Sequence, residues 1–426
     1  MARKQRVTAV DVGATKICCI IADASARGDL EIIGMGVSPN GGMRRGVVVD
    51  VDEVTQAIRS AVGEAEGQAG VSVSRCFVNL SGDFLGGDSS RGSVAIGANN
   101  RVINEHDVQR VIENARMVGV PDGRRMLHVI PKGFTVNEVS GIKNPVGLSA
   151  MQLMVDAHII TGSVSPLQNL QNCMEMAELE PEENSGLVVS GVATSLGVLQ
   201  DEEKDLGVAL VDIGGGTTDL AVFKEGHLRH TDVLCVGGTL VTYDVATALR
   251  VPLQEAERLV IQEGLSFKQE MAARRAAGEE VEAADMEREI EVTSLSSVQP
   301  QPVKVSELSE IIDLRLMDVF EWLRVSFDRL GKMGTRPASI VLTGGVAEMK
   351  GVAWAAEQAL GYPVRIARPE SVRGLPSHLR NPAYSASVGL LIYGLGVLKG
   401  KTPVARSSSV NKALQGFITW LKEYVF

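Results

Sequence analysis

The sequence predicts an α/β protein whose core is a duplicated domain, and two similar segments are the main evidence. Residues 7–21 (VTAVDVGATKICCII) and residues 207–223 (GVALVDIGGGTTDLAVF) both read as an apolar strand, an Asp-x-Gly turn and a second apolar strand. Asp11 and Asp212 occupy the same place in the two segments, about 200 residues apart, which is too long for a solenoid period and suits a duplicated domain. Each half is therefore expected to open with a strand hairpin.

The composition supports a folded protein and excludes several classes. The 426 residues carry a formal net charge of −10 and are 45% hydrophobic, which argues against a disordered chain and against a nucleic-acid binder. The five cysteines are odd in number and lack CxxC spacing, which favours a reducing compartment over a disulfide framework or a zinc site. The longest apolar run, residues 388–398, is too short for a bilayer that needs about 20 residues. Asp11 and Lys16 interrupt the N-terminal stretch that otherwise resembles a secretory signal, so we expect a cytoplasmic protein.

Each predicted hairpin carries groups that suit a phosphate. Glycines beside a turn let backbone N–H groups surround an anion, hydroxyl and ammonium groups add donors, and a carboxylate at a strand end can hold water on Mg²⁺. Either hairpin alone could be an ordinary β-turn, but two facing each other would clamp a nucleoside triphosphate. The candidate residues are Gly13, Ala14, Thr15 and Lys16 in the first hairpin and Gly214, Gly215, Gly216, Thr217 and Thr218 in the second, with Asp11 and Asp212 as candidate metal-binding carboxylates.

A third glycine turn follows later in the chain. Residues 339–352 (SIVLTGGVAEMKGV) read as a buried strand that ends at Gly344 and Gly345, before a helix that begins near Val346. Glycines at a strand end let a flat base approach the backbone, and a helix start offers N–H groups. Alone this is a common strand-to-helix turn. After two phosphate hairpins it predicts an adenosine site, with Gly344, Gly345 and Val346 as candidate contacts.

These residues resemble the actin-like ATPase superfamily, and further motifs resemble the bacterial cell-division FtsA family. The resemblance implies a two-lobed actin-like fold of duplicated RNase H-like domains, with an inserted α+β subdomain called IC, and it implies ATP and Mg²⁺ as ligands. The matching segments, in chain order, are residues 11–16 (DVGATK), 42–50 (GMRRGVVVD), 90–96 (SRGSVAI), 128–134 (HVIPKGF), 141–147 (GIKNPVG), 212–219 (DIGGGTTD) and 381–384 (NPAY).

The resemblance also implies an order of domains along the chain. Strand-like runs in the candidate insert (SVAI, FTVNEV and MQLMVDAHII) fit a small α+β module, and a charge-dense stretch at 254–290 reads as helical. In this organisation the first-lobe core (IA) contains residues 1–83 and 163–204, and the IC insert contains residues 84–162. The second-lobe core (IIA) contains residues 205–235 and 308–364, and its outer subdomain (IIB) contains residues 236–307. The chain then returns to the first lobe at 365–396 and ends in a flexible linker, 397–410, and an amphipathic membrane-targeting helix, 411–426.

Two site residues come from the resemblance alone. The family usually places a lysine-containing helix and a Tyr-Gly pair near residues 257–264, whereas this chain reads ERLVIQEG there, so the resemblance leaves Glu257 as a candidate ribose contact. The helix expected at 307–330 resembles the family's FtsZ-contacting helix, and Arg315 is the candidate partner-binding residue. The alternative is a surface arginine paired with Asp313 or Asp318.

The last residues predict a membrane-binding tail. A polar linker leads to NKALQGFITWLKEYVF (411–426), and residues 399–426 carry five basic side chains and one acidic. A basic amphipathic helix after a linker favours an anionic membrane surface, although it could also dock on the protein body. On a helix, one apolar face contains Leu414, Phe417, Ile418, Leu421 and Val425, with Trp420 at its boundary.

The resemblance implies a division protein that works at the cytoplasmic side of the inner membrane, attached peripherally at the division site. Its partners would be the FtsZ C-terminal peptide, further copies of itself, and other division proteins through the IC insert. The segment that links the lobes, residues 186–199, contains no acidic residue to position an attacking water, so we expect slow or negligible ATP hydrolysis. A type IV pilus assembly adaptor and a small-molecule kinase of the same fold are the alternative functions.

Overall fold

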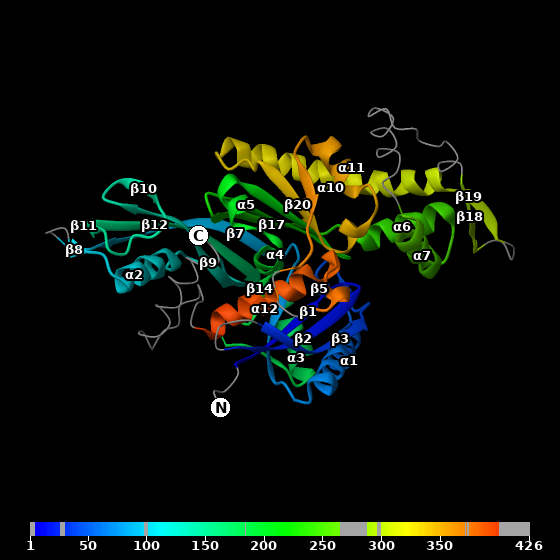
Figure 1. Ribbon diagram of the computed structural model, residues 1–426, viewed down its shortest axis with the longest axis horizontal. Helices are drawn as coiled ribbons and strands as arrows, with labels where there is room; N and C mark the ends of the chain where they lie inside the picture. The colour runs from blue at the N-terminus through cyan, green and yellow to red at the C-terminus, as the bar shows by residue number, and fades with distance from the viewer. Residues whose placement is uncertain are drawn as a thin grey trace.

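The computed structural model describes residues 5–25, 30–97, 101–183, 185–264, 288–295, 300–370, 372 and 375–399. Two lobes lie against each other at the centre of an elongated molecule (Figure 1). A β-rich insert extends from one end of the long axis, and a smaller group of helices with a β-hairpin extends from the other (Figure 1).

The first lobe is built on a six-stranded sheet. Its strands run in the order β13-β6-β1-β2-β3, and β14 also pairs with β6. The predicted hairpin is β1 and β2, which pair antiparallel so that Asp11 lies opposite Cys18. The strands are β1 (Gln5–Val12), β2 (Lys16–Ala24), β3 (Leu30–Pro39), β6 (Arg75–Leu80), β13 (Glu180–Pro181) and β14 (Leu187–Val189), with a small hairpin of β4 (Met43–Arg44) and β5 (Val47–Val48).

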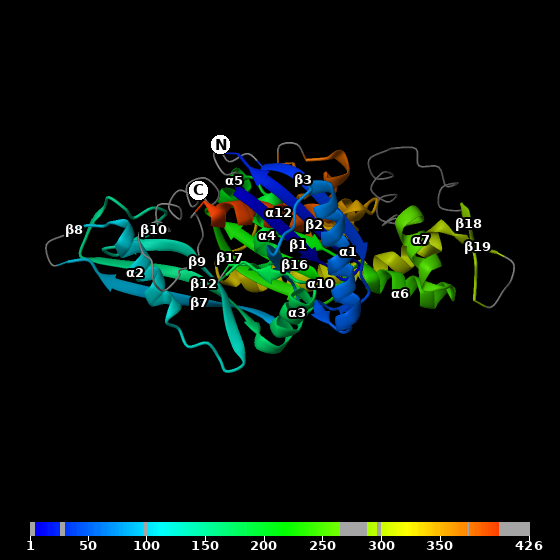
Figure 2. The same ribbon diagram turned by 90° about the horizontal axis from the view of Figure 1, so that it is seen from below.

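Helix α1 (Val51–Ala69) lies directly on this sheet, as Figure 2 shows. Asp50 caps its N-terminus by accepting a hydrogen bond from the Glu53 N–H, and Gly70 ends it with φ of 65°. Two glycines of β3 allow the close approach: a Cβ on Gly34 or Gly36 would lie about 2 Å from a carbonyl oxygen of the helix.

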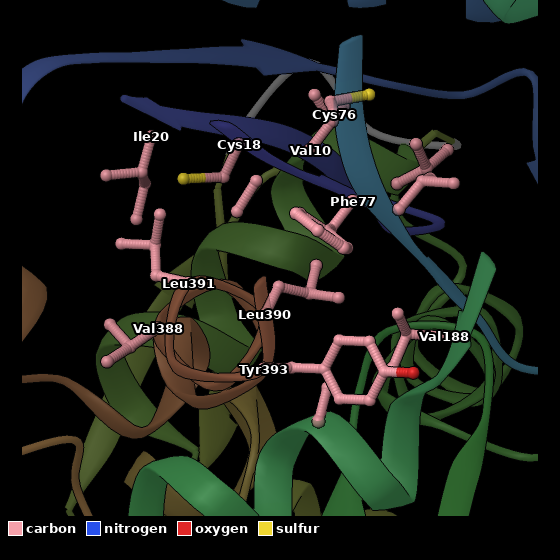
Figure 3. Close-up of a cluster of buried hydrophobic side chains, with 14 of the residues drawn as sticks. Val10, Cys18, Ile20, Cys76, Phe77, Val188, Val388, Leu390, Leu391 and Tyr393 are labelled. Carbon is pink, nitrogen blue, oxygen red and sulfur yellow. The ribbon is translucent and has the colours of Figure 1, made fainter. Parts of the chain in front are cut away.

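Helix α12 (Ser385–Leu398) is the core of the first lobe. It contains the longest apolar run of the sequence, and in the fold this run is a buried helix. Figure 3 shows Leu390, Leu391 and Tyr393 of α12 among side chains from the sheet, including Cys18 and Phe77. Helices α3 (Val164–Met176) and α4 (Ser190–Val198) complete this lobe.

The second lobe repeats the first in its opening topology. In both lobes three consecutive antiparallel strands are followed by a later strand that pairs parallel to the first of them, which is β6 on β1 and β20 on β15. This repeat confirms the duplication that the sequence predicts. The sheet order is β17-β16-β15-β20-β21, from β15 (Val208–Ile213), β16 (Thr218–Lys224), β17 (His227–Leu234), β20 (Ser339–Thr343) and β21 (Val364–Ile366), with α5 (Asp201–Leu206), α10 (Val305–Lys332), α11 (Val352–Leu360) and the 3₁₀ helix η1 (Gly345–Glu348). The 3₁₀ helices η2 (Ser377–Leu379) and η3 (Pro382–Tyr384) then return the chain to the first lobe, whose core includes Leu379.

The insert is a separate α+β unit with its own apolar core. Helix α2 (Glu105–Arg116) starts at a reciprocal capping box between Asn104 and Asp107, and Gly92 lets it lie on β7, because a Cβ there would be 2.2 Å from the Val111 carbonyl oxygen. The sheet order is β10-β9-β12-β7, from β7 (Leu85–Ala95), β9 (Arg124–Val136), β10 (Val139–Ile142) and β12 (Gln152–Ser163), and β8 (Arg101–Val102) pairs with β11 (Ser149–Ala150).

The opposite end corrects one prediction. The sequence predicts a helix over residues 254–290, and α7 (Leu253–Glu263) is helical, but residues 289–292 form the strand β18. Their alternating EIEV pattern has the period of two that is typical of a strand. The residues between 264 and 288 lie outside the described part of the chain. This end contains α6 (Gly238–Leu249), α7 (Leu253–Glu263), β18 (Glu289–Val292) and β19 (Gln301–Lys304).

Candidate functional site

A cleft of about 840 Å³, open to solvent, lies between the lobes. Both predicted hairpin turns and the third glycine turn line it. Of the predicted residues, the lining includes Asp11, Gly13, Ala14, Thr15, Lys16, Asp212, Gly214, Gly215, Gly216, Thr217, Gly344 and Gly345.

The two hairpin turns have the same geometry and face each other. The Gly13 N–H donates to the Lys16 carbonyl at 3.0 Å, and the Gly214 N–H donates to the Thr217 carbonyl at 2.9 Å. A Cβ on Gly215 would lie 2.6 Å from a methyl carbon of Thr15. The turns therefore approach closely because the second has no side chains at its tip.

Two carboxylates close the first strands of the hairpins and are held by hydrogen bonds from distant segments. Asp11 accepts from Asn79 at 2.7 Å and from Ser387 at 2.6 Å, and Asp212 accepts from Thr194 at 2.8 Å. Burial raises the pKa of Asp11 above its usual range and raises the pKa of Asp212 to about 6. Buried carboxylates resist ionisation unless a cation compensates them.

A third carboxylate, Asp219, was missed by the sequence analysis. It lies opposite Asp212 across the β15–β16 pair and also lines the cleft. Ser81 donates to its Oδ2 at 2.7 Å, whereas its buried Oδ1 has no hydrogen-bond partner among the described residues. Burial and the charge of Asp212 raise the pKa of Asp219 to about 8. Its signal in the sequence is the second aspartate of DIGGGTTD, which is the second residue of strand β16.

These observations fit a hydrated magnesium ion. Three buried acidic groups with raised pKa values converge on one cleft, and a divalent cation would offset both their burial and their mutual repulsion. Within the described ranges no three His, Cys, Asp or Glu residues form a metal-binding group of their own. Mg²⁺ suits such a site, because it keeps several waters and shares phosphate oxygens with one or two carboxylates.

Lys16 supplies the complementary charge for a phosphate. It lines the cleft, burial lowers its pKa, and neither a hydrogen bond nor an ion pair joins its Nζ to any residue that the structure describes. Its nearest recorded partner is the ring of Tyr384, with Nζ 3.7 Å from the ring centroid. An ammonium group that is largely buried without an anion fits a phosphate ligand.

The third turn needs its first glycine. Gly344 has φ of 87°, and a Cβ there would lie 2.4 Å from Oδ1 of Asp212. The helix predicted to begin near Val346 is the short 3₁₀ helix η1, and the α-helix α11 starts only at Val352. The bend at Gly344 and Gly345 still opens onto the cleft.

Three of the predicted nucleotide contacts do not line the cleft. The Thr218 hydroxyl is buried and donates to the Val236 carbonyl at 2.8 Å. Val346 is buried and packs in the core of the second lobe. Glu257 is exposed on α7. The tertiary fold turns these three side chains away from the cleft, and a motif pattern does not reveal that.

Arg315 lies on α10 and is engaged in ion pairs. It pairs with Asp318 at 2.8 Å, as one sequence interpretation predicted, and its Nε also lies 2.6 Å from Asp244 of α6. The second partner, Asp244, is remote in sequence.

The predicted membrane contacts Leu414, Phe417, Ile418, Trp420, Leu421 and Val425 lie outside the described residues. Among the helices of the described chain, none has the length and apolarity to span a bilayer.

Comparisons with known proteins identify the family. A model described as "Cell division protein FtsA" matches residues 209–389, and one described as "SHS2 domain inserted in FTSA" matches residues 82–161. FtsA of Pseudomonas aeruginosa is 36% identical over 389 residues, covering 91% of this chain and 89% of that protein. FtsA of Escherichia coli K12 is 32% identical over 430 residues, covering 99% and 98%.

One solved structure supports the fold. The PilM-PilN type IV pilus biogenesis complex matches with a TM-score of 0.61 at 16% identity, covering 91% of this chain and 98% of that one, which is a likeness of fold alone. MreB5 of Spiroplasma citri, solved bound to ADP, is more distant, with a TM-score of 0.49, 13% identity and coverage of 93% and 96%. With an actin-like fold, an SHS2 insert and 32 to 36% identity over nearly its whole length to these two division proteins, the chain belongs to the FtsA family.

Proposed function

We propose that this protein binds ATP with Mg²⁺ in the cleft, assembles with further copies of itself, and tethers FtsZ filaments to the inner face of the cytoplasmic membrane. The carrying observation is one arrangement: two facing glycine turns, three buried carboxylates and a lysine that has no anionic partner in the described chain. A triphosphate with its metal ion complements both sets of charges. Family membership supports the division role, including recruitment of later division proteins through the insert.

The two turns hold the phosphates in this proposal, and the bend at Gly344 takes the adenosine. Asp11 and Asp212 orient water on Mg²⁺, whose charge stabilises the phosphates. Lys16 contacts a phosphate directly. The neighbouring donors Asn79, Thr194 and Ser387 keep the carboxylates in place.

We infer that ATP hydrolysis is slow. Fast phosphoryl transfer to water needs a side chain that positions the attacking water. The segment linking the lobes contributes Ser190 to the described lining, where a glutamate or glutamine would be needed. A turnover above about one per second, within the usual enzyme range, would contradict this inference.

The tail supplies the membrane attachment in this proposal. Its five or six large apolar side chains would each contribute about 1.5–3 kcal/mol if fully buried, but burial at an interface is partial and the helix must be ordered. A single copy therefore binds reversibly. Several tails in one assembly bind much more tightly, since later attachments are effectively intramolecular.

Vesicle flotation with ATP and Mg²⁺ tests the tethering role. The full chain should float with vesicles that contain anionic lipid, whereas a chain ending at Ser409 and the Trp420→Glu variant should not. Thr419→Glu is the matched control, because it adds the same charge on the polar face and should still float. Equal flotation of all four proteins would refute the tail as the anchor.

Binding of an FtsZ C-terminal peptide to the Ser409 truncation tests the partner. Arg315→Ala should weaken binding at least tenfold. Arg324→Ala is the matched control, because Arg324 lies on the same helix, is exposed and pairs only locally, with Glu321 at 2.7 Å. Equal binding by both variants would remove Arg315 from the interface.

A further inference from the structure

Tyr384 lies beside the cleft, which is lined by its neighbours Pro382 and Ala383. It is the last residue of η3 and directly precedes α12. Its half-buried ring lies against Lys16, the first residue of β2, with Nζ 3.7 Å from the ring centroid. The NPAY motif that contains it was noticed in the sequence only as a family resemblance, with no role attached.

The aromatic ring holds the lysine without neutralising it. A cation above a tyrosine ring is attracted by the ring's negative face, but the ring accepts no proton and carries no net charge. A carboxylate in the same place would form an ion pair and compete with a phosphate for the ammonium group. No described carboxylate lies within the 4.0 Å ion-pair distance of Nζ, although Asp11, Glu348 and Asp212 are near enough to influence its charge.

The position of the ring is fixed from both lobes. Within η3, the Asn381 side chain accepts a hydrogen bond from the Ala383 N–H at 2.8 Å. From the second lobe, the Gly344 N–H donates to the Pro382 carbonyl at 3.2 Å, and the Thr343 hydroxyl lies 2.6 Å from that of Ser385. The segment that places the ring therefore also contacts the bend that lines the cleft at Gly344.

We propose that Tyr384 is a positioning residue for the nucleotide, which keeps the Lys16 ammonium group over the cleft so that it meets the phosphates. The inference rests on the proposed nucleotide-binding function. It requires the face of the ring and not the hydroxyl group. It also requires that the effect of Tyr384 pass through Lys16.

A double-mutant cycle on ATP affinity tests this, measured by calorimetry with Mg²⁺ on the full chain. Tyr384→Leu should weaken binding about three- to thirtyfold, the range expected for loss of a cation–π contact. Tyr384→Phe should restore most of that loss. In a Lys16→Met background, Tyr384→Leu should cause no further loss, because the lysine it positions is gone.

A second tyrosine provides the matched control. Tyr362 lies beside Arg336, with the guanidinium carbon 5.6 Å from its ring centroid, and it does not line the cleft. Tyr362→Leu should leave ATP affinity unchanged. If Tyr384→Leu does not fold, trifluorophenylalanine at position 384 tests the same idea, because fluorination weakens the ring's negative face while keeping its shape. It should bind ATP more weakly than phenylalanine there.

Several results would overturn the inference. These are an equal loss from Tyr384→Leu with and without Lys16, a loss in Tyr384→Phe as large as in Tyr384→Leu, or equal affinities for phenylalanine and its fluorinated form. If the unchanged chain binds no ATP, the proposed function fails together with the inference. If the unchanged chain binds ATP normally and Tyr384→Leu binds equally well, only the inference fails.

Discussion

Gly215 shows what one missing side chain does for the cleft. A Cβ there would lie 2.6 Å from Thr15 of the opposite turn, and the branched side chain of valine would also fill the space in which backbone N–H groups meet an anion. We therefore expect Gly215→Val to weaken ATP binding at least tenfold in calorimetry. Gly67→Val is the matched control: Gly67 lies on α1 with nothing within 4 Å of an added Cβ. Equal affinities for the two variants would place the phosphates elsewhere.

His128 is a buried residue whose protonation should destabilise the fold. Its Nε2 accepts a hydrogen bond from the Val189 N–H at 3.1 Å, so the proton is on Nδ1, which has no partner among the described residues. Burial lowers the pKa of His128 to about 4, whereas an unfolded histidine titrates near 6.5. The unfolded state therefore binds the proton first, and stability is lost as the pH falls from about 6.5 towards 4.

The size of this loss can be measured against a variant without the histidine. His128→Gln keeps a hydrogen-bond acceptor but cannot titrate. The free energy of unfolding of the unchanged chain, relative to the variant, should fall by about 2 kcal/mol between pH 7 and pH 5. Urea unfolding at the two pH values measures it, and the comparison cancels the buried carboxylates, which titrate in both proteins. Parallel pH profiles would contradict the prediction.

At the scale of elements, α4 and α12 approach each other closely at a glycine. An added Cβ on Gly389 of α12 would lie 1.9 Å from the Ala193 carbonyl oxygen of α4, and backbone cannot move aside as a flexible side chain can. We expect Gly389→Ala to lower the free energy of unfolding by about 1–3 kcal/mol. Gly63→Ala makes the same change on α1 with nothing within 4 Å and should stabilise the helix by up to about 1 kcal/mol. Thermal unfolding compares the two, and a stable Gly389→Ala protein would mean that the helices can separate.

The elements that the sequence predicts best are those specified locally. Each hairpin carries its own apolar alternation, turn glycines and strand-end aspartate within about 17 residues, so both hairpins and their duplication were predictable. The strand at 289–292 was assigned to a helix because its charged neighbours suggested a continuous surface helix. Its pairing with β19 is a tertiary contact, which a local pattern does not reveal.

The polar residues around the carboxylates were not predictable in the same way. Asn79, Thr194 and Ser387 come from three separate elements, and each looks in sequence like an unremarkable polar residue beside an apolar run. Asn79 and Ser387 reach Asp11 within the first lobe, and Thr194 reaches Asp212 across the boundary between the lobes, so these contacts depend on tertiary packing. The motif pattern therefore predicted the glycine turns that line the cleft and two of the three acids, while the groups that orient the acids needed the fold.

At the scale of the whole molecule, α12 joins the cleft to the tail. Its first turn meets the cleft through the hydrogen bond from Ser387 to Asp11, and its end at Leu398 directly precedes the basic segment. Fourteen helical residues span about 21 Å. The helix is buried on nearly all sides.

The distribution of charge should make the proposed membrane binding sensitive to salt and to assembly. Residues 399–426 carry five basic side chains and one acidic, whereas the whole chain has a net charge of −10, so an anionic surface attracts the tail and repels the body. Raising salt from about 0.1 M to about 1 M shortens the screening length from about 10 Å to about 3 Å and should reduce flotation. Because one tail binds weakly, the vesicle-bound fraction should rise more steeply than linearly with protein concentration once copies assemble. The control is residues 400–426 fused to a monomeric carrier, whose bound fraction should stay low and rise linearly with protein concentration. The same linear dependence for the full chain would show that assembly does not control attachment.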